Sequence, residues 1–115
     1  MSKVIAVTNQ KGGVGKTTTC AAFAGIFRKN GRSVLAVDLD PQGNLSFSLG
    51  AEDTGFTVHD VMKGRCSLEA AVKHTDICDV LTSNILLSGT ELELDGRDRE
   101  FVLKRALEQA QNKYD

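Results

Sequence analysis

The stretch that decides the fold runs from residue 3 to residue 19 and reads KVIAVTNQKGGVGKTTT. Its first part, residues 3–8, is a short apolar run between polar residues, which predicts a buried β-strand. A glycine-rich segment follows at once. From Lys16 to Asn30 apolar side chains recur at helical spacing, and Gly31 is placed as a C-terminal cap. Strand, glycine-rich loop and helix in this order predict a phosphate-binding loop.

The residues of this loop suit a nucleoside triphosphate. Glycines let the backbone approach phosphate oxygens and take φ angles that a Cβ disfavours, and the amides at the beginning of the helix then face the β-phosphate. Lys16 offers a positive charge to the β- and γ-phosphates, and Thr17 offers a hydroxyl ligand to magnesium. A glycine-rich turn without a ligand is the alternative. We therefore predict ATP and Mg²⁺ as cofactors, bound by Lys11, Gly12, Gly13, Val14, Gly15, Lys16, Thr17 and Thr18.

A second apolar run, residues 33–38, follows the predicted helix. Two strands joined by a helix form the βαβ unit of a parallel sheet with flanking helices, which is the α/β class. Asp38 and Asp40 come at the end of the second strand, and the carboxyl edge of a parallel sheet is where such folds bind ligands. Both carboxylates could instead cap a turn before Pro41, and for Asp38 the two interpretations are nearly even.

The rest of the chain predicts further elements of one domain, residues 1–115. Residues 57–63 and 67–74 are predicted as short helices, the second with Ser67 as its N-cap. Residues 77–83 predict a third strand, residues 86–94 fit a helix or a turn, and residues 99–113 predict an amphipathic helix.

Composition limits the class of protein. Hydrophobic residues make up 41% and charged residues 25%, as in an ordinary soluble domain, and there is no apolar run of about 18 residues. We expect a cytoplasmic protein with reduced cysteines. Residues 1–50 hold six Lys/Arg and two Asp, whereas residues 51–115 hold eight Lys/Arg and thirteen acidic residues. The total charge of the chain would not attract DNA, so a nucleic-acid role needs a local patch or further residues.

The loop departs from the ordinary motif, because Gln10 stands where that motif has a glycine and Lys11 opens the loop. Residues 9–19 thereby resemble the ParA/MinD family of deviant-Walker P-loop ATPases. The resemblance implies that Lys11 reaches the partner's phosphates in an ATP-dependent homodimer. It also implies that Asp40 positions the attacking water and that Asp38 supports the magnesium shell. The implied catalytic residues are Lys11, Lys16 and Asp40, and the implied metal site comprises Thr17 and Asp38.

Residues 40–44, Asp-Pro-Gln-Gly-Asn, are typical of the partition branch of this family, ParA/Soj. The resemblance implies a bacterial ATPase switch of DNA segregation, in which ATP-dependent dimerisation controls non-specific DNA binding by the full-length protein. A ParB-type protein is the implied partner. The implied location is cytoplasmic, on the nucleoid when ATP is bound, without stable membrane association.

Members of the family continue, after the helix equivalent to residues 99–113, into a strand that ends in the Walker B aspartate. We therefore expect this chain to be the N-terminal part of such an ATPase domain, truncated before that strand and catalytically incomplete. A MinD-like, membrane-associated regulator of cell division is one alternative, although residues 99–113 have balanced charges and a membrane helix of that kind is rich in Lys and Arg. An inactive nucleotide-binding fragment is the other.

Overall fold

The protein is described by a computed structural model that covers residues 3–7, 14–40, 42–51, 55–84 and 96–115, with backbone alone at 14–15 and 96–100. Its centre is a three-stranded sheet in the order β1-β3-β2. β1 and β3 are parallel, with Ala36 opposite Val80, whereas β2 runs antiparallel to β3. The strands span Leu35–Val37 (β1), Val72–His74 (β2) and Asp79–Leu81 (β3). The predicted α/β class is confirmed, and the sheet is mixed rather than wholly parallel.

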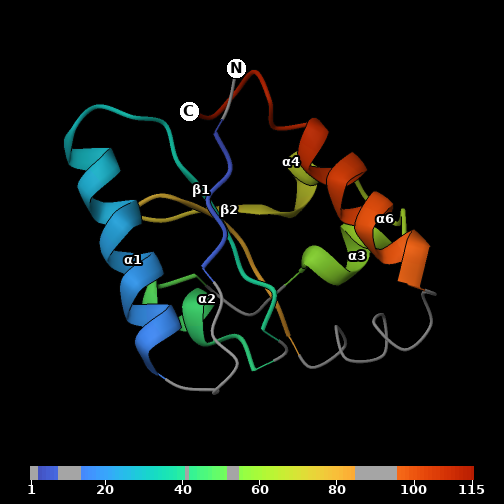
Figure 1. Cartoon of the computed structure of the whole chain (residues 1–115), viewed down its shortest axis with the longest axis horizontal. Coiled ribbons are helices and arrows are strands. Elements are labelled where there is room, and N and C mark those ends of the chain that lie inside the picture. The colour runs from blue at the N-terminus through green and yellow to red at the C-terminus, as the bar shows by residue number, and fades with distance from the viewer. Residues whose placement is uncertain (1–2, 8–13, 41, 52–54, 85–95) are drawn as a thin grey trace.

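Helices cover both faces of this sheet (Figure 1). Ala36 and Val80 face one apolar cluster, and Leu81 faces the other, because successive side chains of a strand point to opposite faces. Helices α1 and α2 supply the first cluster, whereas α3, α4 and α6 supply the second. The helices span Val14–Lys29 (α1), Asn44–Ser48 (α2), Val58–Met62 (α3), Leu68–Ala71 (α4) and Gly96–Glu108 (α6).

The prediction of a long helix after the loop is confirmed by α1. Gly31 follows α1 with a φ of 78°, a left-handed conformation that glycine adopts without steric cost. Among the described side chains of α1, Ala24 is the buried one, and it packs in the cluster that contains Ala36 and Val80 of the sheet. Phe23 and Phe27 stack on each other with their ring centroids 5.8 Å apart. Phe23 is 44% exposed, so this aromatic pair lies at the surface of the protein rather than in its core.

The helix predicted over residues 67–74 is wrong in its second half. Ser67 does cap α4, since its Oγ accepts a hydrogen bond from Ala70 N at 3.3 Å, but α4 ends at Ala71. Residues 72–74 form β2, because their backbone pairs with β3. The pairing with β3 outweighs the local preference of residues 72–74 for a helix, because strand formation depends on tertiary context.

Both ends of the last predicted helix differ from prediction. The helix expected over residues 99–113 begins earlier, at Gly96, and ends at Glu108, followed by turns to Lys113. Ala106 of α6 and Ala110 of the turns that follow it are buried. The sequence predicts no element over the residues of α2. Residues 86–94 lie outside the described residues.

The buried strand predicted over residues 3–8 is wrong for its described part, residues 3–7, where no strand is assigned. Val4 is 78% exposed and Ile5 is 61% exposed. Lys3 N donates to Asp115 O at 2.7 Å, and Asp115 N donates to Ser33 O at 2.7 Å. The backbone of Asp115 thus hydrogen-bonds both to Lys3, near the beginning of the chain, and to Ser33, which precedes β1. Apolar composition predicts a strand, but a strand also needs a neighbour along its length to complete its hydrogen bonds.

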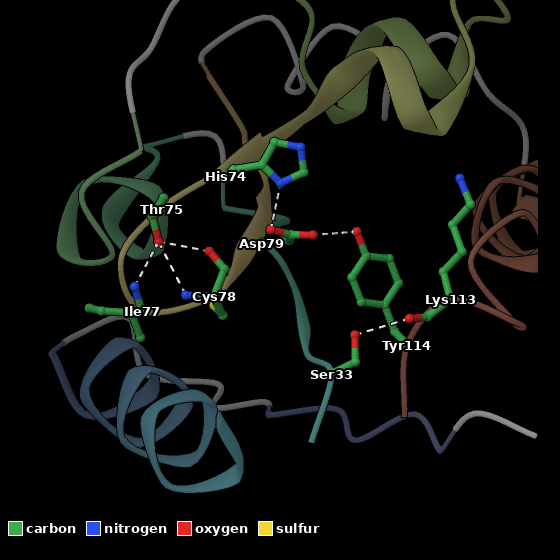
Figure 2. Close-up of polar contacts among 8 residues, drawn as sticks. All are labelled: Ser33, His74, Thr75, Ile77, Cys78, Asp79, Lys113 and Tyr114. Carbon is green, nitrogen blue, oxygen red and sulfur yellow. Dashed lines mark hydrogen bonds and ion pairs between the residues drawn. The ribbon is translucent and has the colours of Figure 1, made fainter. Parts of the chain in front are cut away.

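A polar cluster holds the end of the chain against the sheet (Figure 2). Asp79, at the beginning of β3, accepts a hydrogen bond from Tyr114 Oη at 2.7 Å and contacts His74 Nδ1 at 2.7 Å. Ser33 Oγ donates to Lys113 O at 3.0 Å. These contacts join β2, β3 and the segment before β1 to the residues that follow α6.

This cluster predicts a loss of stability at alkaline pH. Burial, together with the hydrogen bond to Asp79 and its negative charge, raises the pKa of the Tyr114 phenol above its usual value of 10.0. A group whose pKa is raised by folding stabilises the folded state below its unfolded pKa and ceases to do so as the pH rises through the folded value. We expect the free energy of unfolding to fall above pH 10.0, and to fall less steeply in Tyr114→Phe. Urea unfolding of both proteins across this range measures the difference; parallel curves would contradict the expectation.

Candidate functional site

Asp38 is the first side chain beyond the carboxyl end of β1, and it is 2% exposed. Its backbone N donates to Leu81 O at 3.0 Å, which continues the parallel pairing of β1 with β3. One carboxylate oxygen, Oδ1, accepts from Asp40 N at 3.0 Å. The other, Oδ2, accepts from Ser46 N at 2.9 Å and from Ser46 Oγ at 2.7 Å. A buried carboxylate requires such donors, because burial without them is costly.

Asp40 lies two residues further on and is half-buried. Its Oδ1 accepts from Gln42 N at 3.0 Å and its Oδ2 accepts from Asn44 Nδ2 at 3.1 Å. Gly43 N donates to Asp40 O at 2.8 Å. These bonds draw Gln42, Gly43 and Asn44 back towards Asp40 just before and at the beginning of α2, and Asp40 is less buried than Asp38.

The beginning of α1 supplies the other half of the candidate site. Lys16 and Thr17 lie in its first turn and are half-buried, and Thr18 is exposed. α1 packs against α2 and β1, and Figure 1 shows the beginning of α1 beside α2. Burial and then the negative charge of Asp38 raise the pKa of the Cys20 thiol, so the second turn of α1 lies within electrostatic reach of Asp38.

The structure therefore places the predicted residues as two neighbouring groups. Asp38 and Asp40 are joined directly by a hydrogen bond, and Lys16 and Thr17 belong to α1, which packs against β1 and α2. Val14 and Gly15 form the first residues of α1. Lys11, Gly12 and Gly13 lie outside the described residues. The roles implied for all these residues stay predictions.

Two site residues were missed by the sequence analysis, Ser46 and Ser83. Ser46 is 4% exposed and Ser83 is 2% exposed, and Ser83 N donates to Ser46 Oγ at 3.2 Å. They are 37 residues apart in the chain, and serine occurs too widely for either position to signal a buried polar contact. The hydroxyls of Thr82 and Ser83 are buried without a hydrogen-bond partner among the described residues.

Gly43 joins the Asp40 turn to the end of β3. Its φ is 70°, and a Cβ placed there would lie 3.1 Å from Ser83 O. Gly50 also has a positive φ, 76°, but a Cβ there would meet nothing within 4 Å. Glycine is therefore required at Gly43 by conformation and by close approach, and at Gly50 by conformation alone.

We expect Gly43→Ala to lower the free energy of unfolding by about 1–3 kcal/mol more than Gly50→Ala. Both substitutions carry the cost of a left-handed residue, about 1–2 kcal/mol, but only the first forces Ser83 or the Asp40 turn to move. Urea unfolding of the two variants gives the difference. Equal losses would mean that the close approach of Gly43 to Ser83 has no energetic weight.

Comparison with known proteins identifies the family of this chain. A family model described as an AAA domain matches residues 2–115. The chain belongs to this family. It is 43% identical over 120 residues to the sporulation initiation inhibitor protein Soj of Bacillus subtilis, covering 100% of this chain and 47% of Soj. It is 40% identical to the chromosome partitioning protein ParA of Caulobacter vibrioides, covering 92% of this chain and 42% of ParA. The predicted ParA/Soj type is confirmed.

Solved structures confirm the P-loop NTPase fold. A structure named cobyrinic acid a,c-diamide synthase, from Mycobacterium smegmatis with bound ADP and magnesium, is 46% identical with a TM-score of 0.93, over 100% of this chain and 49% of that one. The septum site-determining protein MinD of Pyrococcus horikoshii, complexed with Mg-ADP, is 33% identical with a TM-score of 0.67, over 91% of this chain and 42% of that one. The chain spans about half the length of the curated relatives it matches.

Among the described residues, no helix is both long and apolar enough to cross a membrane.

Proposed function

We propose that this chain is the nucleotide-binding part of a ParA/Soj-type ATPase of DNA segregation. The observation that supports it most is the Asp38–Asp40 turn, held at the carboxyl end of β1 beside the helix that carries Lys16 and Thr17. Carboxylates at that edge, next to a helix N-terminus with a cation, provide the groups that phosphoryl transfer needs. The relatives named Soj and ParA are the second support.

In this proposal ATP binds with magnesium at the beginning of α1. Lys16 contacts the β- and γ-phosphates, Thr17 ligates the metal, and Gly12, Gly13, Val14, Gly15 and Thr18 contribute backbone amides or side-chain contacts. Asp40 positions the attacking water, and Asp38 supports the metal shell through the residues it holds. The bound Mg²⁺ would supply charge neutralisation at the phosphates.

ATP binding would then control association. Lys11 of one chain would contact the phosphates held by a second chain, so that ATP closes a homodimer, the dimer binds non-specific DNA, and a ParB-type partner promotes hydrolysis. A ligand shifts such an equilibrium by its difference in affinity for the two states. The protein would act in the bacterial cytoplasm, on the nucleoid in its ATP form, without stable membrane association.

The test separates binding from dimerisation. We expect Lys11→Ala to bind ATP with magnesium as the wild type does, and to dimerise about tenfold more weakly in its presence, because one charge contact across the interface is lost. Calorimetry measures the first quantity and sedimentation velocity the second. Wild-type protein that binds ATP but stays monomeric at high concentration would overturn the dimer switch.

A second candidate is an ATP-dependent synthase that forms amides on a cobyrinic acid, as the name of the most similar structure described above suggests. Both candidates use the same ATP site. ATP turnover that rises with cobyrinic acid and an amino donor, and is unaffected by DNA or a ParB-type protein, would favour the synthase.

A further inference from the structure

The hydroxyl of Ser46 makes two hydrogen bonds, one as donor and one as acceptor. It donates its only proton to Asp38 Oδ2 at 2.7 Å, and it accepts the backbone N–H of Ser83 at 3.2 Å. A serine hydroxyl has one donor and two acceptor sites. The two contacts together therefore determine which way the Oγ–H bond points.

Asp38, in turn, is held by Ser46 and holds Asp40. Ser46 provides both donors to Oδ2, one from its backbone and one from its side chain, whereas Oδ1 accepts from Asp40 N. With 2% exposure, Asp38 has little contact with solvent. The carboxylate of Asp38 thus connects Ser46 of α2 to the backbone of Asp40.

Ser83 and its neighbour Thr82 connect these residues to the end of β3 and to α3. Ser83 follows β3, and its neighbour Thr82 accepts the N–H of Val58, the first residue of α3, through its backbone oxygen at 2.8 Å. Ser83 O also lies against Gly43. The Ser46 hydroxyl therefore links α2 to the ends of β1 and β3. The backbone of Thr82 joins the end of β3 to the beginning of α3.

From these contacts we propose that Ser46 is a positioning residue for ATP hydrolysis. It acts through Asp38 to set the backbone, and hence the carboxylate, of Asp40, and it makes that setting depend on the position of Ser83. The inference rests on the proposed ATPase function. It assigns Asp38 the task of holding Asp40, and it adds a residue that no sequence motif marks.

The test is steady-state ATP turnover by the full natural protein in Ser46→Ala, Ser46→Thr and Ser48→Ala. We expect Ser46→Ala to lower kcat about tenfold, the scale of one lost hydrogen bond to a charged group, with KM and the Kd for ATP within about twofold. Ser46→Thr keeps the hydroxyl and should restore most of kcat. Ser48→Ala makes the same change at an exposed position of α2 and should match the wild type.

The outcomes separate the two proposals. If the wild type neither binds nor hydrolyses ATP, the proposed function fails. If it does both, and Ser46→Ala keeps the wild-type kcat, or loses it while Ser46→Thr loses as much, the positioning role is wrong. Should Ser46→Ala fail to fold, Asp38→Asn preserves the volume but has a single acceptor oxygen, so its amide cannot accept from Ser46 and from Asp40 N at the same time. It should then show the same loss of kcat at unchanged Kd, and a wild-type kcat would overturn the role.

Discussion

Replacing Lys16 with alanine is expected to weaken the binding of ATP with magnesium by about 30- to 100-fold. Lys16 lies in the first turn of α1, which has no acidic residue, so its positive charge is not neutralised within that turn. A hydrogen bond between charged groups contributes about 1.5–3 kcal/mol, and each 1.4 kcal/mol is a tenfold change in affinity. Isothermal titration calorimetry on this chain, at constant ionic strength, measures the change.

Lys29→Ala is the matched control for this experiment. Lys29 is exposed and lies in the last turn of the same helix, so its loss changes the net charge equally but far from the proposed phosphates. Its affinity for ATP should equal that of the wild type. If both variants bind ATP as the wild type does, Lys16 is not a phosphate ligand and the loop assignment is wrong.

Replacing Leu81 with alanine is expected to lower the free energy of unfolding by about 2–5 kcal/mol, because it leaves a cavity in the core. Leu81 is 0% exposed. It lies in β3, the strand paired on both sides, and faces the cluster formed with α3, α4 and α6. Chemical unfolding followed by circular dichroism measures the loss in this chain.

Leu39→Ala removes the same atoms near the end of β1, where Leu39 is 44% exposed. Its expected loss is under about 1 kcal/mol, since little apolar area returns to water. Equal losses at the two positions would show that the cluster around Leu81 does not carry the stability that its burial indicates.

The parts of the fold that could be predicted are those with local causes. α1 has a helical apolar pattern and ends at Gly31, whose left-handed φ favours glycine. Residues 35–37 and 79–81 lie within the predicted strands 33–38 and 77–83, and both are strands. Residues 72–74 could not be assigned in this way, because their conformation depends on pairing with β3. Residues 3–7 show the opposite case, in which apolar side chains predicted a strand that the described structure leaves exposed.

The residues of the candidate site also fall into two groups, those whose position follows from the local sequence and those that only the fold brings together. By itself the sequence determined that a glycine-rich segment precedes α1 and that Asp38 and Asp40 end a strand, because spacing along the chain is a local property. Only the tertiary structure decided that Asp38 is buried, that Ser46 and Ser83 meet beside it, and that Gly43 lies against Ser83. These contacts join residues up to 40 positions apart, and they exist because β1 and β3 pair in parallel and bring both strand ends to one edge.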